Sequence, residues 1–122
     1  MKGEKKTLVI GASDNPARYS YLAIHRLKQG GYPVVAIGKR KTVVAGIPVD
    51  TEKINYDRVH TVTLYLNPKH QTEYFDYILS LKPQRIIFNP GAENNQLASL
   101  AESRGIHTQD ACTLVLLSTG QY

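Results

Sequence analysis

Residues 7–21, TLVIGASDNPARYSY, decide the fold of this chain. The apolar run at 7–11 stops at a glycine, as a buried strand does before a sharp turn. A polar stretch follows and leads into residues 20–29, where apolar residues such as Ile24 and Leu27 recur at helical spacing. The segment therefore predicts a strand, a long turn and a helix, the unit from which parallel α/β sheets are built.

The same alternation of strands and helices continues along the chain. Further strands are expected at 33–37, 59–66, 85–88 and 106–109, and helices from Pro68 to before Pro83, over 94–104 and in the tail after 110. One or two short edge strands are expected around Gly46, because Pro48 suits only an edge. We predict an α/β fold over residues 1–122: a single three-layer Rossmann-like domain with a mainly parallel sheet of about five or six strands.

The bulk composition narrows the class of protein. The chain has 122 residues, 42% hydrophobic and 20% charged, which is typical of one folded domain. No apolar run approaches the ~18 residues of a membrane span, and the apolar stretch after MKGEKK is too short for a signal peptide. A single cysteine, Cys112, rules out a disulfide within the chain, and we expect a cytoplasmic protein.

The net charge of +5 suits either nucleic acid or a phosphorylated small molecule. The basic residues are spread along the chain, with clusters only at 2–6 and 39–41, and the tyrosines do not alternate with them on a strand. We therefore expect a small-molecule nucleotide ligand and neither nucleic acid nor a membrane. A protein partner stays open.

Ligands of open α/β sheets bind beyond the carboxyl ends of the strands. The strand exits that would meet there are 11–13, 38–41, 66–68 and 89–91. Gly11 allows a sharp turn, and the amides that follow it at a helix start suit an anion such as a pyrophosphate. An ordinary polar turn is the alternative. Asp14 would repel a phosphate, so we expect its side chain to point outward or to serve the turn.

The residues that follow the expected strand at 33–37 indicate which kind of nucleotide the chain binds. NAD-binding domains place an acid about 20 residues after the glycine loop to hold the ribose hydroxyl. Here Gly38 is followed by Lys39, Arg40 and Lys41, which would attract a ribose phosphate, so NADP or coenzyme A is favoured over NAD. A solvated basic loop is the alternative.

Several polar residues near these strand exits each have two candidate roles. Arg18 could reach a pyrophosphate or lie on the surface, and Asn67 and Asn89 could contact a ligand or cap the helices that follow them. His25 and His70 are expected at the surface.

Catalytic and metal sites are not predicted. The histidines have no metal-ligand spacing with Cys112, which is expected to be a buried small hydrophobe. Tyr65 and Glu93 are weak candidates for a general acid. Two alternatives to a binding module therefore stay open: an NADP-dependent oxidoreductase completed by oligomerisation, and a protein-interaction domain that has lost its ligand.

Five segments together resemble the small, free-standing coenzyme A-binding proteins of Rossmann-like fold, which are similar to the N-terminal domain of the succinyl-CoA synthetase α subunit. They are VIGASDNPARYSY (9–21), AGIPVDT (45–51), LYLNP (64–68), IIFNPGAEN (86–94) and DACTLVLLSTGQY (110–122). The resemblance covers about residues 6–120, and GAS followed by NP is its most specific part.

The resemblance implies coenzyme A or an acyl-CoA bound across the carboxyl edge, without catalysis by this chain. The pyrophosphate would lie on the first loop, at Gly11, Ala12, Ser13, Asn15, Arg18 and Tyr19. The 3′-phosphate would lie near Gly38, Lys39, Arg40 and Lys41. The nucleotide would be flanked by Leu66, Asn67 and Pro68, and the pantetheine arm would run toward Asn89, Pro90, Gly91 and Glu93.

Two departures limit what the resemblance implies. The glycine-rich loop of the synthetase is GASDNPAR here (11–18), so its contacts are not carried over one by one. The phosphorylated histidine of the synthetase belongs to a second domain that we do not expect here, so ligase chemistry is not implied.

Overall fold

A computed structural model describes residues 2–122 as alternating strands and helices. The strands in this range are β1 (Thr7–Ala12), β2 (Val34–Gly38), β3 (Thr42–Val44), β4 (Ile47–Asp50), β5 (Thr61–Leu64), β6 (Arg85–Phe88) and β7 (His107–Asp110). The helices are α1 (Tyr19–Gln29), α2 (Phe75–Ser80), α3 (Asn95–Glu102) and α4 (Thr113–Ser118). Three short 3₁₀ turns complete the set: η1 (Lys2–Glu4), η2 (Pro68–His70) and η3 (Thr72–Tyr74).

The strands of residues 2–122 form one seven-stranded sheet in the order β3-β4-β2-β1-β5-β6-β7. Only β3 within this part of the chain is antiparallel to its neighbour. The sheet exceeds the predicted five or six strands because β3 and β4 form a complete hairpin. Its two-residue turn, Ala45 and Gly46, has positive φ angles of 53° and 78°, which match the twist of a tight hairpin. The fold is thus a single α/β domain with a mostly parallel, Rossmann-like sheet.

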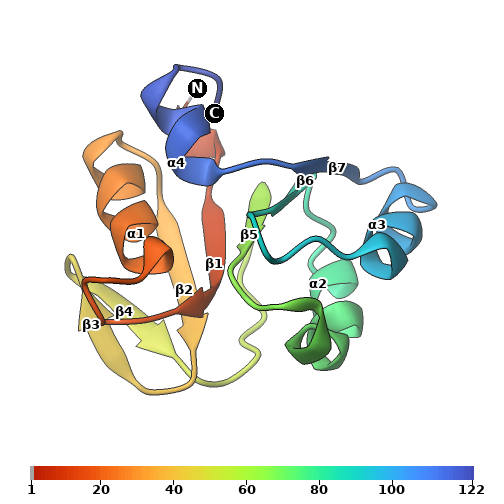
Figure 1. Ribbon diagram of the computed structural model, residues 1–122, viewed down its shortest axis with the longest axis horizontal. Coiled ribbons are helices and arrows are strands. Elements are labelled where there is room, and N and C mark those ends of the chain that lie inside the picture. Colours follow the sequence, from red (N-terminus) through yellow and green to blue (C-terminus); the bar gives the residue numbers. More distant parts are fainter. Residues whose placement is uncertain (1) are drawn as a thin grey trace.

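Helices cover both faces of this sheet, as Figure 1 shows: α1 and α4 lie on one side, and α2 and α3 on the other. Successive strand residues enter opposite cores, because side chains alternate along a strand. In β1, Leu8 packs in the core under α2 and α3, whereas Val9 packs in the core under α1 and α4. Both side chains are fully buried, and each such burial contributes about 2 kcal/mol.

The segment after β5 differs from the continuous helix expected from Pro68. The turns η2 and η3 come first, and α2 begins only at Phe75. Backbone bonds from the Gln71 amide to the Pro68 carbonyl and from the Tyr74 amide to the Gln71 carbonyl have 3₁₀ spacing, and the fully buried Gln71 side chain holds this junction against other segments. The helix in the tail is confirmed as α4, which packs against α1.

The order of the strands opens a crevice at one edge. From β1 the chain passes through α1 to β2 on one side, and it later returns to β5 on the other side of β1. Ligands of open α/β sheets bind outside the carboxyl ends of the strands at such a reversal. Among residues 2–122, every helix is too short or too polar to span a bilayer.

Candidate functional site

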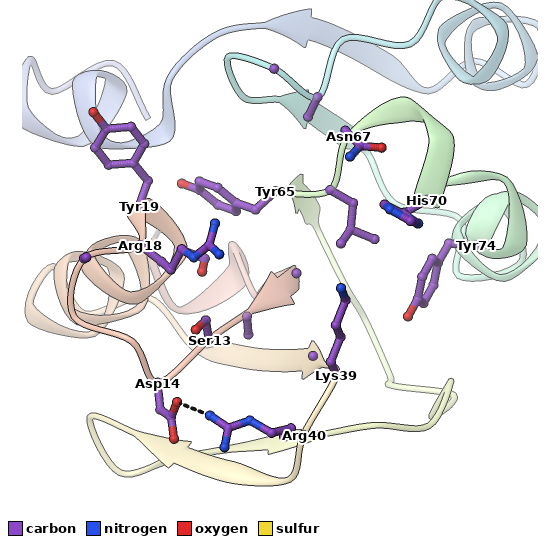
Figure 2. Close-up of a pocket in the computed structure, with 18 of the residues that line it drawn as sticks. Ser13, Asp14, Arg18, Tyr19, Lys39, Arg40, Tyr65, Asn67, His70 and Tyr74 are labelled. Carbon is purple, nitrogen blue, oxygen red and sulfur yellow. Dashed lines mark hydrogen bonds and ion pairs between the residues drawn. The ribbon is translucent and has the colours of Figure 1, made fainter.

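A groove of about 890 Å³ lies at the carboxyl edge of the sheet. Its walls come from the segments that follow β1, β2, β5 and β6, namely parts of 11–20, 38–42, 65–74 and 90–92. Figure 2 shows Arg18 and Ser13 on one side, Asn67, His70 and Tyr74 on the other, and Lys39 between them. The four predicted strand exits therefore meet in one groove.

The first wall is a turn closed by its own side chains. The Ser13 hydroxyl accepts a hydrogen bond from the Asn15 amide at 3.0 Å, and Asn15 Oδ1 accepts one from the Ala17 amide at 3.0 Å. Asn15 serves the turn and does not line the groove, unlike Ser13. The Ser13 hydroxyl keeps its proton available for a ligand oxygen.

Helix α1 begins directly behind this turn. Its N-cap residue, Arg18, has extended backbone angles, and the N-cap side chain makes no capping hydrogen bond. The first amides of such a helix and its dipole attract an anion. Arg18 and Tyr19 both line the groove, and Tyr19 is 68% exposed.

Gly11 fits where a larger residue would not. Its φ angle is +94°, and a Cβ there would lie 3.0 Å from the backbone carbon of Tyr65. The glycine therefore lets the exit of β1 pass close to the exit of β5, which brings the two walls of the groove together.

The three cations of the basic loop after β2 have different surroundings. Lys39 points into the groove in Figure 2, whereas Lys41 is exposed and does not line it. Arg40 Nη2 donates to Asp14 Oδ1 at 2.8 Å, and Thr42 Oγ1 donates to Asp14 Oδ2 at 2.9 Å. In Figure 2 the Asp14 side chain points away from Arg18 and toward Arg40, so it joins the two loops at the rim.

The exit of β5 forms the facing wall. Leu66 and Asn67 line the groove, but Pro68 does not. Asn67 takes the N-cap position of η2, yet its side chain makes no capping bond, so it is no helix cap. His70 is exposed, as expected, and η2 turns it toward the groove, which the expected continuous helix did not reveal.

Fewer polar side chains from the exit of β6 line the groove than the sequence predicts. Pro90 and Gly91 line the groove, whereas Glu93 does not, and its Oε1 accepts from the Gly91 amide at 2.9 Å. Asn94 caps α3 instead, accepting from the Leu97 amide at 3.1 Å.

Asn89 lies behind the groove rather than in it. Only 2% of its surface is exposed, and its amide donates to Thr63 Oγ1 at 2.7 Å and to the Leu64 carbonyl at 2.9 Å. Its Oδ1 accepts from the Thr113 amide at 2.9 Å. Asn89 therefore ties β5 to the start of α4, and it neither reaches the groove nor caps the helix that follows it.

Comparison of the sequence with known families gives a match over nearly the whole chain. The family model of the CoA binding domain matches residues 5–118. This chain belongs to the CoA binding domain family. No curated protein matches it.

Solved structures are similar to this CoA binding domain over nearly its whole length. An uncharacterized protein with a crystal structure is 46% identical, with a TM-score of 0.94, and the match covers 97% of this chain and 98% of that one. A hypothetical protein from Pyrococcus horikoshii OT3 is 22% identical (TM-score 0.85; 94% and 82% covered). A protein from Thermus thermophilus is 16% identical (TM-score 0.84; 97% and 90% covered). The last two share the fold.

Gln71 supports the groove of the CoA binding domain and was not predicted. Its buried Nε2 donates to the Leu66 carbonyl at 2.8 Å and to the Ala92 carbonyl at 2.7 Å. Its Oε1 accepts from Asn94 Nδ2 at 3.0 Å. The amide thus holds the exits of β5 and β6 together, through contacts that no local pattern in the sequence reveals.

Tyr65 lines the groove, but its hydroxyl is buried. Burial raises the pKa of Tyr65 to about 12, an effect that the nearby Thr113 and Thr63 hydroxyls partly offset. The tyrosine oxygen makes no hydrogen bond within residues 2–122, and the two threonine hydroxyls bond to each other at 2.8 Å. Tyr65 therefore keeps its proton at neutral pH and packs as part of the wall.

Two further residues of the CoA binding domain differ from expectation. His25 is half-buried against the Tyr21 ring, with centroids 4.6 Å apart, rather than at the surface. Cys112 is half-buried at the N-cap of α4 rather than fully buried. No group of three potential metal ligands (His, Cys, Asp or Glu) occurs within residues 2–122.

Proposed function

We propose that this CoA binding domain binds coenzyme A or an acyl-CoA in the groove as a non-catalytic binding module. The observation that carries the proposal is the meeting of the α1 start, Arg18 and Lys39 in one groove of about 890 Å³. A groove of that size lies near the upper end of the range of about 300–1,000 Å³ that is usual for small-molecule and cofactor sites. The positive groups suit the phosphates of such a ligand.

The pyrophosphate would bind to the first wall. The Ser13 hydroxyl, the first amides of α1 and the Arg18 guanidinium would donate to its oxygens. These groups combine the positive end of a helix dipole with charge-assisted hydrogen bonds, the usual means of holding a diphosphate.

The 3′-phosphate would bind to Lys39. Of the three cations in the basic loop, Lys41 lies outside the groove and Arg40 is paired with Asp14. Lys39 points between the walls, where an ammonium group can meet a phosphate as a point charge (Figure 2). Lys39 would then favour coenzyme A, which carries a ribose phosphate, over NAD, which carries none.

The pantetheine arm would run past Leu66, Pro90 and Gly91. The positions of Tyr65 and Glu93 favour a binding role over an NADP-dependent oxidoreductase. The Tyr65 hydroxyl is buried, and its pKa of about 12 makes it a weak acid, while Glu93 lies outside the groove with its carboxylate on the Gly91 amide. Neither side chain offers a proton to a substrate in the groove.

A thermal-shift panel with coenzyme A, acetyl-CoA, NADP, NAD and ATP tests the proposal. A ligand at 100 times its Kd stabilises the fold by about 2.7 kcal/mol, which raises the Tm of a domain of this size by roughly 10 °C. We expect such a shift with coenzyme A and acetyl-CoA. A shift with NADP alone would favour the reductase, and no shift with any of the five would favour a protein-interaction domain.

A further inference from the structure

The ion pair between Asp14 and Arg40 places a carboxylate beside the basic loop in the groove wall, whereas Glu73, the other acidic residue that lines the groove, lies on the facing wall. Asp14 lies in the groove wall with its two oxygens on different partners, Arg40 at 2.8 Å and Thr42 at 2.9 Å. In Figure 2, Arg40 turns away from Lys39 toward Asp14. Two cations of the basic loop, Lys39 and Arg40, line the groove, and the ion pair with Asp14 keeps Arg40 from a ligand.

Asp14 bonds to the basic loop, at Arg40 and Thr42, rather than within its own turn. The turn at 13–18 is closed by Ser13 Oγ and Asn15 Oδ1, so it does not need the Asp14 carboxylate. The two loops also meet without the ion pair, because β1 and β2 are adjacent parallel strands with Ala12 in register with Gly38. The carboxylate is therefore free to act on Arg40.

The pair is exposed enough to open. The Arg40 side chain is 75% exposed and the Asp14 side chain is 36% exposed, and ion pairs of this kind are weak in water. A phosphomonoester carries more negative charge than a carboxylate and offers three oxygens to a guanidinium. It can therefore compete with Asp14 for Arg40, while Asp14 repels it.

We propose that Asp14 weakens the preference of the groove for a ribose phosphate, by holding Arg40 in an ion pair that has to open before Arg40 can join Lys39 on the 3′-phosphate. This inference rests on the proposed function. Asp14 is a positioning residue that acts through Arg40 and lowers the affinity for the phosphorylated nucleotide relative to its dephosphorylated form.

Calorimetric titration of the wild type and of Asp14→Asn with coenzyme A and dephospho-coenzyme A tests the inference. We expect Asp14→Asn to bind coenzyme A about fivefold more tightly and dephospho-coenzyme A within twofold of the wild type. Asp57→Asn is the matched control, because it removes the same charge from an exposed side chain that pairs only locally, with Arg58. It should change neither affinity.

The Arg40→Gln background separates the two ways in which Asp14 could act. If Asp14 works through Arg40, the gain from Asp14→Asn should largely disappear there. An equal gain in that background would overturn the role given to Arg40. Asp14→Ser provides a second test should Asp14→Asn fold poorly, with the same expected gain.

Failure of the inference differs from failure of the proposed function. If the wild type binds coenzyme A but Asp14→Asn and Asp14→Ser bind it no more tightly, only the inference is overturned. If the wild type binds neither ligand, the proposed function is wrong and the inference falls with it.

Discussion

Gly38 at the end of β2 lies against the carbonyl oxygen of Ala12 at the end of β1, so closely that a Cβ at position 38 would overlap that oxygen. The contact joins two strands whose exits form the basic loop and the first wall of the groove. Because the obstacle is backbone, it cannot turn away as a side chain would. The groove therefore depends on a glycine at this position.

Gly38→Ala should destabilise the fold by roughly 1–3 kcal/mol, the usual cost of forcing an extra carbon into a packed site. Urea unfolding measures the difference. Gly3→Ala is the matched control: a Cβ there meets nothing within 4 Å, and its effect should stay within about 0.5 kcal/mol. Equal stabilities for the two variants would contradict the importance of this contact.

Lys39→Ala should weaken coenzyme A binding about tenfold, since it removes a charged donor from the proposed 3′-phosphate. Lys41→Ala removes the same charge outside the groove and should change the affinity less than about twofold. Competition for a fluorescent coenzyme A analogue measures both. Equal losses would mean that the loop acts through its overall charge and that Lys39 has no special contact.

Gln71→Leu should destabilise the fold by roughly 2–4 kcal/mol, because it leaves the Leu66 and Ala92 carbonyls without their buried donor. Thermal and urea unfolding give the difference. The control is Gln96→Leu, on an exposed position of α3, where little change is expected. A Gln71→Leu variant as stable as Gln96→Leu would show that the buried amide contributes nothing net.

His60 should make the fold less stable in mild acid. Its pKa is lowered from the ordinary 6.5, first by burial and then by Arg85 and Lys5. The unfolded chain therefore binds the proton more readily than the folded protein. The stability is complete above pH 6.5 and falls as the pH drops below that value toward the lowered pKa.

Urea unfolding between about pH 7 and pH 5 tests this, with a shallower pH dependence expected for His60→Asn than for the wild type. His107→Asn, at an exposed position, is the control and should keep the wild-type slope. An unchanged slope in His60→Asn would rule out His60 as a source of the acid sensitivity.

The layered fold could be predicted because its signals are local. Leu8 and Val9 are both apolar and face opposite cores, which is the pattern of a parallel strand covered on both sides. The position of the groove followed from the same pattern, since parallel strands end at a common edge. The two 3₁₀ turns after Pro68 were not predicted, because the buried partners of Gln71 lie on other segments of the chain.

The roles of individual polar residues were harder to predict. Asn89 looked like a cap for the next helix, but its partners Thr63 and Thr113 are brought to it only by the packing of the sheet and α4. Likewise, Lys39 and Arg40 are equivalent in sequence. They differ because Arg40 forms an ion pair with Asp14, 26 residues earlier in the chain, whereas Lys39 points into the groove.

Titration calorimetry of the wild-type protein with coenzyme A and dephospho-coenzyme A is the most direct test of the central claim. The account predicts saturable binding of one coenzyme A per chain, about tenfold tighter than dephospho-coenzyme A because Lys39 meets the 3′-phosphate. No binding of coenzyme A, or equal affinity for the two ligands, would contradict it.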